Sequence, residues 1–565
     1  MFSFALQHAS WPDDVFAFRL WNLGIHLLNG VLLYFLAWCL AGLRGLAPKS
    51  RQVAAFAASA LWLLHPMQVS TVLYVVQRMT QLSATFSLVA LLIYLWGRQL
   101  AMEKPGRGYA VMTLGLIGAG LLAALSKENG ALLPLFILVL EATLLRGLPS
   151  PCRFGLWKTI VLWLPLAGAG GYFAAQYATM IQPGYALRDF SPAEHLLTEA
   201  RALSDYLALL VLPRAGSFGL FHDDYAVSRG LLLPPHTLLA VVVVAGLLLA
   251  ALLWVRRFPL FSFAQLWFFC GHLLESSIIP LESYFEHRNY FPSVGLAIAA
   301  GLVLEGVALR WGHQRKWLLA GGAVWLLLFG MMTWNECRLW GNPALQARVW
   351  ARQHPDSERA QLQFAKAQLV AGDGAGAAST YRRMAAKHPG VYAVWASAFC
   401  LGLESMEPIP FEQARSALSQ AVFSKTAFGG LEAVVRAKEN KSCAAVPAQQ
   451  TLALFDALLA NRNYKSQFFH LQVLKGRLLA VEGEPLAAVA CFERAQQLRP
   501  QVDLALLAVK TLAESGLLGE ARDYLQRARA LNDSSGNMAR YHFAEQIRAW
   551  EAALNGKAAA NLRTR

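Results

Sequence analysis

The chain has 565 residues, a formal net charge of +15 at pH 7 and a mean hydropathy of +0.38. With 56% apolar and only 15% charged residues it is not wholly a water-soluble globular protein, and the composition indicates several membrane spans. The positive charge does not indicate nucleic acid as a partner, because many basic residues lie in short loops between apolar runs, where they set topology and contact membrane lipids. The seven cysteines are scattered and form no CxxC pair, so they predict neither a zinc site nor a disulfide framework.

Apolar runs near the length of a bilayer crossing fill the first 336 residues. They lie at about 20–43, 52–66, 80–97, 108–125, 129–145, 158–178, 236–255, 259–275, 291–309 and 317–334. No basic leader with a cleavage site precedes them, so we expect no cleavable signal peptide. The sequence therefore predicts an all-α fold with two domains, a polytopic membrane helix bundle of about ten spans over 1–338 and a soluble helical domain over 339–565.

Basic residues are distributed unevenly between the loops of this bundle. Five loops together hold fourteen of them, whereas the three short loops on the opposite face hold only Arg78, Lys127 and Arg288. Because basic loops stay in the cytoplasm, these three residues are expected outside it. Ten crossings that start outside also end outside. We therefore expect an integral protein of a bacterial inner membrane, with the C-terminal domain in the periplasm.

The extracytoplasmic loops carry the most informative polar residues. They are His65 to Gln68, Ser126 to Asn129, the excursion over 179–234 and Glu286 to Ser293. Charged and imidazole side chains are costly at membrane depth, so a cluster at the boundary predicts a functional face. Within the excursion, leucines at helical spacing over 193–212 predict an amphipathic helix in the interface plane.

Each of these strings also has a structural interpretation. Lys127 and Glu128 would form an ion pair at a tight turn, and His65 before Pro66 would end a helix. Arg288 would pair with Glu286. The convergence of all three strings on one face favours a functional site.

The chemistry of this face suits a lipid-linked phosphosugar. An anionic phosphate at a membrane surface is best held by Arg and Lys through charge-assisted hydrogen bonds. Sugar transfer also needs a carboxylate, either as the base for the acceptor hydroxyl or as a ligand of a divalent metal. The residue pattern leaves open which of these roles applies, and it identifies no cofactor.

Three strings carry a resemblance to a known family: "LLHPMQVSTVLYVVQRMTQLSATFSLVALLIYL", "LLAALSKENGALLPLFILVLE" and "EHRNYFPSVGLAIAAG". They resemble the transmembrane-and-TPR-containing protein O-mannosyltransferases and their bacterial relatives, which belong to the GT-C superfamily. "FRLWNLGIHLLNGVLLYFLAWCLAGL" is similar to the second membrane helix of that family. The resemblance implies transfer of a sugar from a polyprenyl-phosphate donor to an extracytoplasmic acceptor, which would be a protein.

The resemblance also implies roles for individual residues. Arg288 would bind the donor phosphate, assisted by Lys127 and Arg78. The supporting residues of the site would be His65, Glu128, Glu286 and Tyr290.

The family places its catalytic carboxylate in a first extracytoplasmic loop after a first membrane helix, and this sequence opens near the end of such a loop. Asp13 and Asp14 are the only acidic pair before the first apolar run, and they are weak catalytic candidates because such a pair also caps helices. The catalytic residue is therefore unassigned, and we expect an N-terminally shortened chain. The alternative function is a catalytically silent, membrane-anchored scaffold for envelope or glycan assembly. A transporter is less favoured, because carriers bind substrate at the bilayer midplane.

The soluble half shows internal repetition at the TPR period. Gln353-His354-Pro355 and Lys387-His388-Pro389 are 34 residues apart. Ala488, Phe492 and Ala495 have the spacing of the small and large TPR positions, and they recur 33 residues later as Ala521, Leu525 and Ala528. The pattern predicts a TPR-type α-solenoid whose groove binds an acceptor protein or a partner subunit. The register over 390–465 stays open. Cys400 and Cys443 could form a disulfide there.

Overall fold

The structure is a computed structural model that describes residues 2–7, 14–185, 188–403, 405–534 and 537–555. The fold is all-α, and the described residues contain no β-strand beyond one isolated bridge between Gly230 and Leu233. The chain divides into two compact units, Met1–His354 and Pro355–Arg565. The boundary thus falls after a further short helix, 16 residues beyond the one placed at 338/339 from hydropathy.

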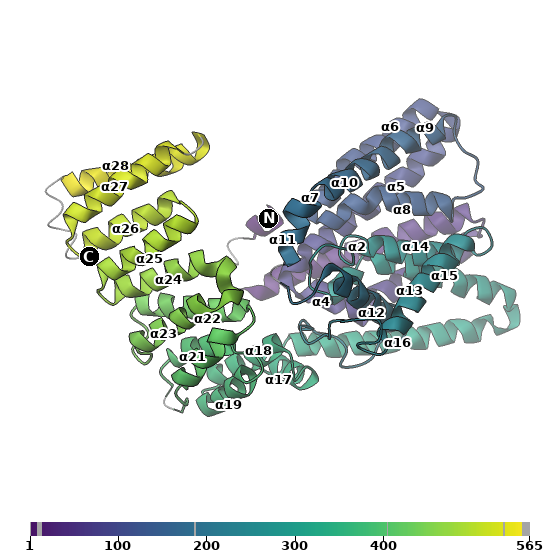
Figure 1. Ribbon diagram of the computed structural model, residues 1–565. Helices are drawn as coiled ribbons and strands as arrows, with labels where there is room; N and C mark the ends of the chain where they lie inside the picture. Colours follow the sequence, from purple (N-terminus) through teal and green to yellow (C-terminus); the bar gives the residue numbers. More distant parts are fainter. Residues whose placement is uncertain (1, 8–13, 186–187, 404, 535–536, 556–565) are drawn as a thin grey trace. The chain divides into compact units, whose positions relative to one another are not determined.

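The first unit is a bundle of long and short helices (Figure 1). Its α-helices are α1 Phe2–Ala5, α2 Val15–Leu43, α3 Pro48–Leu63, α4 Val69–Leu73, α5 Arg78–Glu103, α6 Pro105–Gly115, α7 Leu121–Ser126, α8 Leu133–Ala142, α9 Phe154–Lys158, α10 Leu164–Ala175, α11 Gln182–Tyr185, α12 Pro192–Val211, α13 Thr237–Leu253, α14 Pro259–His272, α15 Pro292–Arg310, α16 Arg315–Trp340 and α17 Pro343–Gln353. Short 3₁₀ turns (η2 Pro66–Gln68, η3 Val75–Gln77, η5 Glu128–Leu132, η8 Glu286–Asn289 and η9 Gly312–Gln314) and π turns (η4 Leu116–Gly120, η6 Thr159–Trp163 and η7 Tyr177–Ile181) connect or interrupt them.

Among the described residues, five helical segments are long and apolar enough to cross a membrane, or six if the bent pair Pro48–Leu63 and Pro66–Leu73 is one span. The sequence predicted about ten. The run at 129–145 forms only a 3₁₀ turn and the ten-residue α8, and the run at 158–178 is divided by π turns. Apolar composition does not reveal these breaks, so the number ten stays a prediction.

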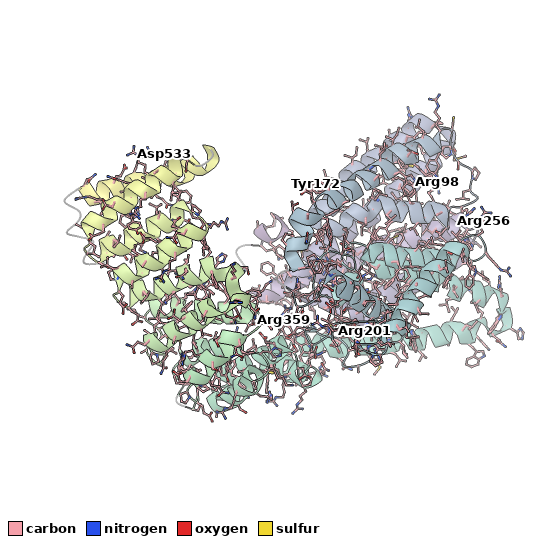
Figure 2. All side chains as sticks on the ribbon, in the orientation of Figure 1. Arg98, Tyr172, Arg201, Arg256, Arg359 and Asp533 are labelled. Carbon is pink, nitrogen blue, oxygen red and sulfur yellow. A yellow bond between two sulfur atoms is a disulfide. The ribbon has the colours of Figure 1, made fainter. Side chains whose placement is uncertain are left out.

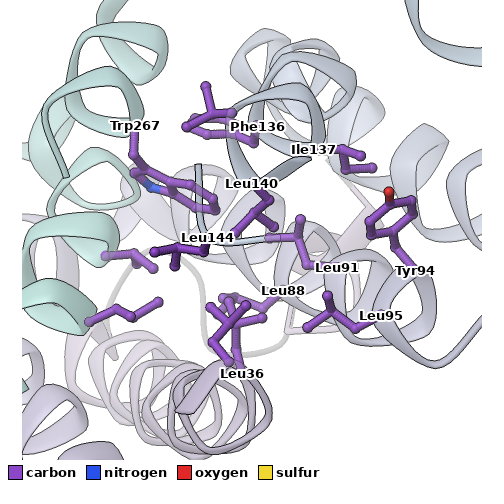
Figure 3. Packing of buried hydrophobic residues seen from close by; sticks show 14 of the residues in the cluster. Leu36, Leu88, Leu91, Tyr94, Leu95, Phe136, Ile137, Leu140, Leu144 and Trp267 are labelled. Atoms are coloured by element: carbon purple, nitrogen blue, oxygen red, sulfur yellow. The ribbon is translucent and has the colours of Figure 1, made fainter. Parts of the chain in front are cut away.

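The core of this unit lies between α2, α3, α5, α8, α14 and α15. Figure 3 shows Leu36 of α2 facing Leu88 and Leu91 of α5, with the ring of Phe136 of α8 tilted against that of Trp267 of α14. Arg98 and Arg256, which come from two predicted cytoplasmic loops, lie at the same end of the bundle (Figure 2), although Arg98 is buried against Glu141. The predicted orientation in the membrane stays a prediction.

The second unit is a stack of helices (Figure 1), in which sequence neighbours pack on each other from α24 to α28, while α20 packs on α22 and α21 on α23. Its elements are α18 Glu358–Val370, α19 Gly374–Ala385, α20 Val391–Phe399, α21 Phe411–Gln420, α22 Lys425–Glu439, α23 Ala448–Ala460, the 3₁₀ turn η10 Arg462–Gln467, α24 Phe468–Val481, α25 Pro485–Leu498, α26 Val502–Glu514, α27 Leu518–Asp533 and α28 Asn537–Asn555. A disulfide joins Cys400 and Cys443, on the segments that follow α20 and α22.

The residues that carried the repeat pattern lie inside this stack. Ala488, Phe492 and Ala495 are buried on α25. A Cβ on Gly476 of α24 would lie 2.4 Å from the Phe492 ring, so glycine lets the two helices approach closely. The pattern of small and large residues that the sequence shows therefore arises from the close packing of α24 on α25.

Candidate functional site

Lys127 is fixed by a tight turn between α7 and η5. Its backbone is extended, and its N–H donates to the Ala123 carbonyl at 3.1 Å. Gly130 closes the turn by donating to the Lys127 carbonyl at 2.9 Å. A Cβ on Gly130 would lie 2.2 Å from the carbonyl carbon of Ala123, so no other residue fits there without moving the turn. The string Ser126-Lys127-Glu128-Asn129-Gly130 thus holds the Lys127 side chain inside the bundle, where it is buried.

Arg288 reaches the same region from the turn η8. Its guanidinium lies 3.4 Å from Oε1 of Glu199 on α12 and 3.7 Å from Oε2 of Glu275, which follows α14. It also donates to the backbone carbonyls of Ser283, at 3.3 Å, and Glu282. The side chain is buried, and the polar groups of three segments surround it.

Lys127 and Arg288 meet through a shared acid. Nζ of Lys127 lies 2.7 Å from Oε1 of Glu275, whose other oxygen faces Arg288. Nε2 of His195 lies 3.8 Å from Glu199, one helical turn away on α12. We call these five residues the charged cluster. All five side chains are buried, and buried charges persist only where opposite charges and hydrogen bonds compensate them.

The two acids of the charged cluster have opposite pKa shifts. Burial alone would raise the pKa of Glu275, but the charges of Lys127 and Arg288 outweigh it and lower that pKa to about 2. Burial raises the pKa of Glu199 to about 7, against the lowering effect of Arg288. Burial and the nearby Arg288 lower the pKa of His195 to about 4, so its ring is neutral at pH 7. Near neutral pH, Glu275 is therefore ionised while Glu199 exchanges a proton.

A small cavity lies against the two cations, and we call it the polar cavity after the charged and hydroxyl-bearing residues that form part of its lining. Its volume is about 20 Å³, and Lys127, Arg288 and Asn129 line it together with hydroxyl groups of α5. Those hydroxyls belong to Thr80, Ser83 and Ser87. A cavity of this size holds about one water molecule. The charged cluster is therefore closed in this structure, with its cations bound to its own acids.

A larger apolar cavity of about 380 Å³ begins directly after Asn129. Gly130, Ala131, Leu133 and Pro134 line one side of it, and residues of α6, η4, η6 and α10 line the other. Thr113 is its one hydroxyl-bearing lining residue among those described. The turn 127–130 therefore stands between a cationic cavity and an apolar one.

The structure brings Lys127 and Arg288 together, as the sequence predicted, but it places Arg78 elsewhere. Arg78 donates to Oδ1 of Asn22 at 2.8 Å and to the carbonyls of Ser3 and Phe18, at 3.0 and 3.1 Å. It does not line the polar cavity. Its contacts tie α5 to α2 and to the first helix.

His65 and Tyr290 also make structural contacts. His65 accepts a hydrogen bond from the N–H of Met67 at 3.1 Å and so caps η2, while its Nε2 lies 3.2 Å from the Leu210 carbonyl. The hydroxyl of Tyr290 contacts Nδ1 of His26 at 2.9 Å and accepts from Nδ2 of Asn29 at 3.1 Å. Both residues therefore hold helices together in the described structure.

The acidic candidates have different surroundings from those expected. Glu286 accepts from the N–H of Gly219 at 2.6 Å and contacts His222 at 3.2 Å, so the expected pair of Glu286 with Arg288 is wrong. Glu128 is exposed at the start of η5, and Lys127 pairs with Glu275 in its place. Asp14 caps α2 by accepting from the N–H of Ala17 at 3.0 Å. Asp13 lies outside the described residues.

Sequence reasoning missed Glu199, Glu275 and His195. A signal was present for each. Glu275 is a lone acid at the end of an apolar run, which is a functional indication at membrane depth. Glu199 and His195 are four residues apart on the predicted amphipathic helix, and Glu199 lies between Leu196 and Leu203 on the leucine face, where a charged side chain is unusual. Among the described residues there is no group of three or more His, Cys, Asp or Glu side chains that could hold a metal ion.

Comparisons with protein-family models, curated proteins and solved structures found no match. The function is therefore inferred from the contacts of these residues.

Proposed function

We propose that the chain is an integral membrane glycosyltransferase of the GT-C type, which moves a sugar from a polyprenyl-phosphate donor to an extracytoplasmic protein acceptor. The observation that carries the proposal is that Lys127 and Arg288, from distant segments, line one buried polar cavity. Both are among the three basic residues of the loops opposite the basic face.

The charge of the cluster suits a phosphodiester. With Glu275 ionised and Glu199 protonated, the two cations exceed the acids by one positive charge, which a phosphodiester monoanion would balance. Arg and Lys bind phosphate oxygens through charge-assisted hydrogen bonds. The apolar cavity after Asn129 would then receive the first part of the polyprenyl chain.

Binding requires the cluster to open. The polar cavity of about 20 Å³ is too small for a phosphate group, so the phosphate would have to displace Glu275 from Lys127. Protonation of Glu199 weakens its hold on Arg288 and so favours the exchange. In this proposal Arg288 and Lys127 bind the donor, and Glu199 adjusts the charge that the donor meets.

The second unit would recruit the acceptor. We propose that it is a TPR-type solenoid outside the cytoplasm, whose groove binds an acceptor protein or a partner subunit. The pairing of α24 with α25 around Gly476 and Phe492 supports the repeat assignment. The disulfide between Cys400 and Cys443 supports an oxidising compartment such as the periplasm.

Donor binding by the full-length chain in lipid nanodiscs tests the proposal, with radiolabelled polyprenyl-phosphate mannose as the first probe. Arg288→Ala removes a charge-assisted contact worth about 1.5–3 kcal/mol, so donor affinity should fall about 10-fold or more. Arg288→Lys should restore affinity only partly, because a point charge replaces a planar fork. Because Arg288→Lys keeps a positive charge in the buried cluster, it also helps to distinguish a loss of donor binding from a loss of folding.

Arg98→Ala is the matched control. Nε of Arg98 lies 2.6 Å from Oε1 of Glu141 in another buried ion pair, and neither residue lines the polar cavity. Its loss should cost stability without changing the affinity for donor in the folded fraction. Unchanged donor binding by folded Arg288→Ala would remove this residue from the proposed site. If the chain binds the donor but transfers mannose to no acceptor, the transferase part of the proposal is wrong and only lipid binding stands.

A silent scaffold is the second candidate, and one observation favours it. Both cations already contact acids inside the protein, Lys127 with Glu275 and Arg288 with Glu199, and the cavity beside them admits about one water. A scaffold would bind no donor lipid, and the Arg288 variants would then change stability alone. The nanodisc experiment therefore distinguishes the two functions.

A further inference from the structure

A second hollow lies on the other side of the start of α15. It is a groove of about 800 Å³ between α3, α15 and α16. Pro292 lines the small polar cavity, whereas the next residue, Ser293, lines this groove, and the two share no lining residue. The groove is therefore separate from the charged cluster, and the inference that follows does not depend on the proposed function.

The walls of the groove are apolar along their length. Phe56 of α3, Leu296 of α15 and Phe329 of α16 are representative of them, and no Asp, Glu, Lys or Arg is among the described lining residues. Along α15 the groove extends from Ser293 to Leu304, which is about 16 Å at the rise of an α-helix. That length is about half the hydrocarbon core of a bilayer. Because α15 and α16 are both candidate membrane spans, we infer that the groove opens to lipid chains.

One end of the groove is polar, and His65, Gln68 and Ser293 form it. Both ring nitrogens of His65 have hydrogen-bond partners, as described above. The Ser293 hydroxyl accepts from Trp62 Nε1 at 3.1 Å and from Gln68 Nε2 at 3.2 Å, and it donates to the Tyr290 carbonyl at 3.1 Å. These two side chains are therefore satisfied within the protein.

Gln68 is not. Its side chain is only 2% exposed, yet its Oε1 has no hydrogen-bond partner. A buried acceptor without a donor is destabilising, so a ligand that supplies one donor at this point gains binding free energy. Of the buried polar atoms on the described lining residues, this oxygen alone lacks a partner. The groove thus offers one acceptor, a long apolar wall and no charge.

We propose that the groove binds a long-chain lipid alcohol, whose hydroxyl donates to Oε1 of Gln68 and whose chain lies between α3, α15 and α16. A lipid phosphate would bring a negative charge to an end that holds no cation. A diacylglycerol would bring ester carbonyls for which the groove has no free donor. A single hydroxyl on an apolar chain fits both the charge and the hydrogen-bonding capacity of the site.

Photolabelling of the full-length chain in nanodiscs tests this. The probe is geranylgeraniol with a diazirine near the tail and an alkyne for recovery, and labelled peptides are mapped by mass spectrometry. We expect labelling of α16 between Leu319 and Phe329. Unlabelled geranylgeraniol should compete at least about 10-fold better than geranylgeranyl phosphate or a phosphatidylcholine. Equal competition by phosphatidylcholine would mean that any bilayer chain fills the groove, and stronger competition by the phosphate would assign it to a charged lipid. Either result overturns the proposal.

Two glycines of α16 provide a matched pair of variants. A Cβ on Gly321 or on Gly330 meets no atom within 4 Å, so both positions accept a larger side chain, but only Gly321 lines the groove. Gly321→Leu should reduce labelling about 5-fold or more, while Gly330→Leu should leave it unchanged. Gln68→Leu should lower the affinity for the alcohol about 5-fold and that for the phosphate not at all. Unchanged labelling in Gly321→Leu would place the lipid elsewhere.

Discussion

The raised pKa of Glu199 makes a pH dependence of stability measurable in the first unit. Burial raises this pKa from 4.5 to about 7, and Arg288 offsets only part of the increase. A carboxyl group whose folded pKa is raised stabilises the fold most at pH values below 4.5, where both states are protonated. The contribution is lost as the pH rises through 7, because the unfolded chain releases its proton first.

The size of the effect follows from the shift. At roughly 1.4 kcal/mol for each pKa unit, the full contribution is about 3 kcal/mol, and most of it disappears between pH 5 and pH 8. His195 acts in the opposite direction, because burial and Arg288 lower its pKa to about 4, and its contribution is lost as the pH falls below 6.5. A variant that changes Glu199 alone is therefore needed to isolate the term.

Glu199→Gln supplies the neutral form at every pH. The assay is thermal unfolding of the detergent-solubilised full-length chain at pH 5 to 8, followed by tryptophan fluorescence. Relative to the variant, the wild-type midpoint should fall by roughly 5 °C between pH 5 and pH 8. Glu128→Gln removes an exposed carboxylate of a neighbouring turn and should follow the wild type throughout. If the difference in thermal midpoint between wild type and Glu199→Gln were the same from pH 5 to pH 8, Glu199 would be ionised in the folded protein. The charge balance proposed for donor binding would then be wrong.

Three further predictions address topology, folding and the Lys127 turn. Alkaline phosphatase fused after residue 345 should be active and a cytoplasm-only fluorescent reporter dark, because the basic loops lie on the other face; the reverse pattern would invert the topology. Residues 355–565 should fold alone and melt cooperatively by circular dichroism, with a lower midpoint after reduction of the Cys400–Cys443 disulfide, and a disordered fragment would contradict the repeat assignment. Gly130→Ala should lower both the thermal midpoint and the donor affinity, because a Cβ there collides with the backbone of Ala123. Gly118→Ala is the control and should change neither, because a Cβ at Gly118 meets no atom within 4 Å.

Much of the helical fold could be predicted from hydropathy, because long apolar runs have few alternatives in a membrane. The runs at 20–43, 291–309 and 317–334 correspond to α2, α15 and α16. The divisions of the runs at 129–145 and 158–178 could not be predicted. A 3₁₀ or π turn changes the hydrogen-bond register without changing the apolar composition, and composition was the signal used.

The site was predictable in its cations and not in its acids. Lys127 and Arg288 are rare basic residues on their face, so the sequence singles them out. Glu275 and Glu199 meet them only through tertiary packing, which one sequence does not reveal. Proximity in the chain suggested Glu286 as the partner of Arg288. In the 3₁₀ turn η8, three residues complete a turn, so residues two apart point to different sides and contact different neighbours.

The turn η8 and the start of α15 explain why one short string is so informative. Arg288 belongs to the charged cluster, Tyr290 anchors α2 through His26 and Asn29, and Ser293 closes the polar end of the groove. Trp62 holds the same backbone from α3 by donating to the Tyr290 carbonyl at 3.0 Å.

The start of α15 is tightly packed against α14 beside the polar cavity. A Cβ on Gly271 of α14 would lie 2.5 Å from the ring of Pro292, the residue before Ser293 of the groove. Interiors packed this closely transmit displacements instead of absorbing them. Opening of the charged cluster for a phosphate would therefore press on a wall that Pro292 and Ser293 share. A lipid in the groove, on the other side of that wall, would favour one position of the start of α15, so the two sites would affect each other's affinity by the same factor.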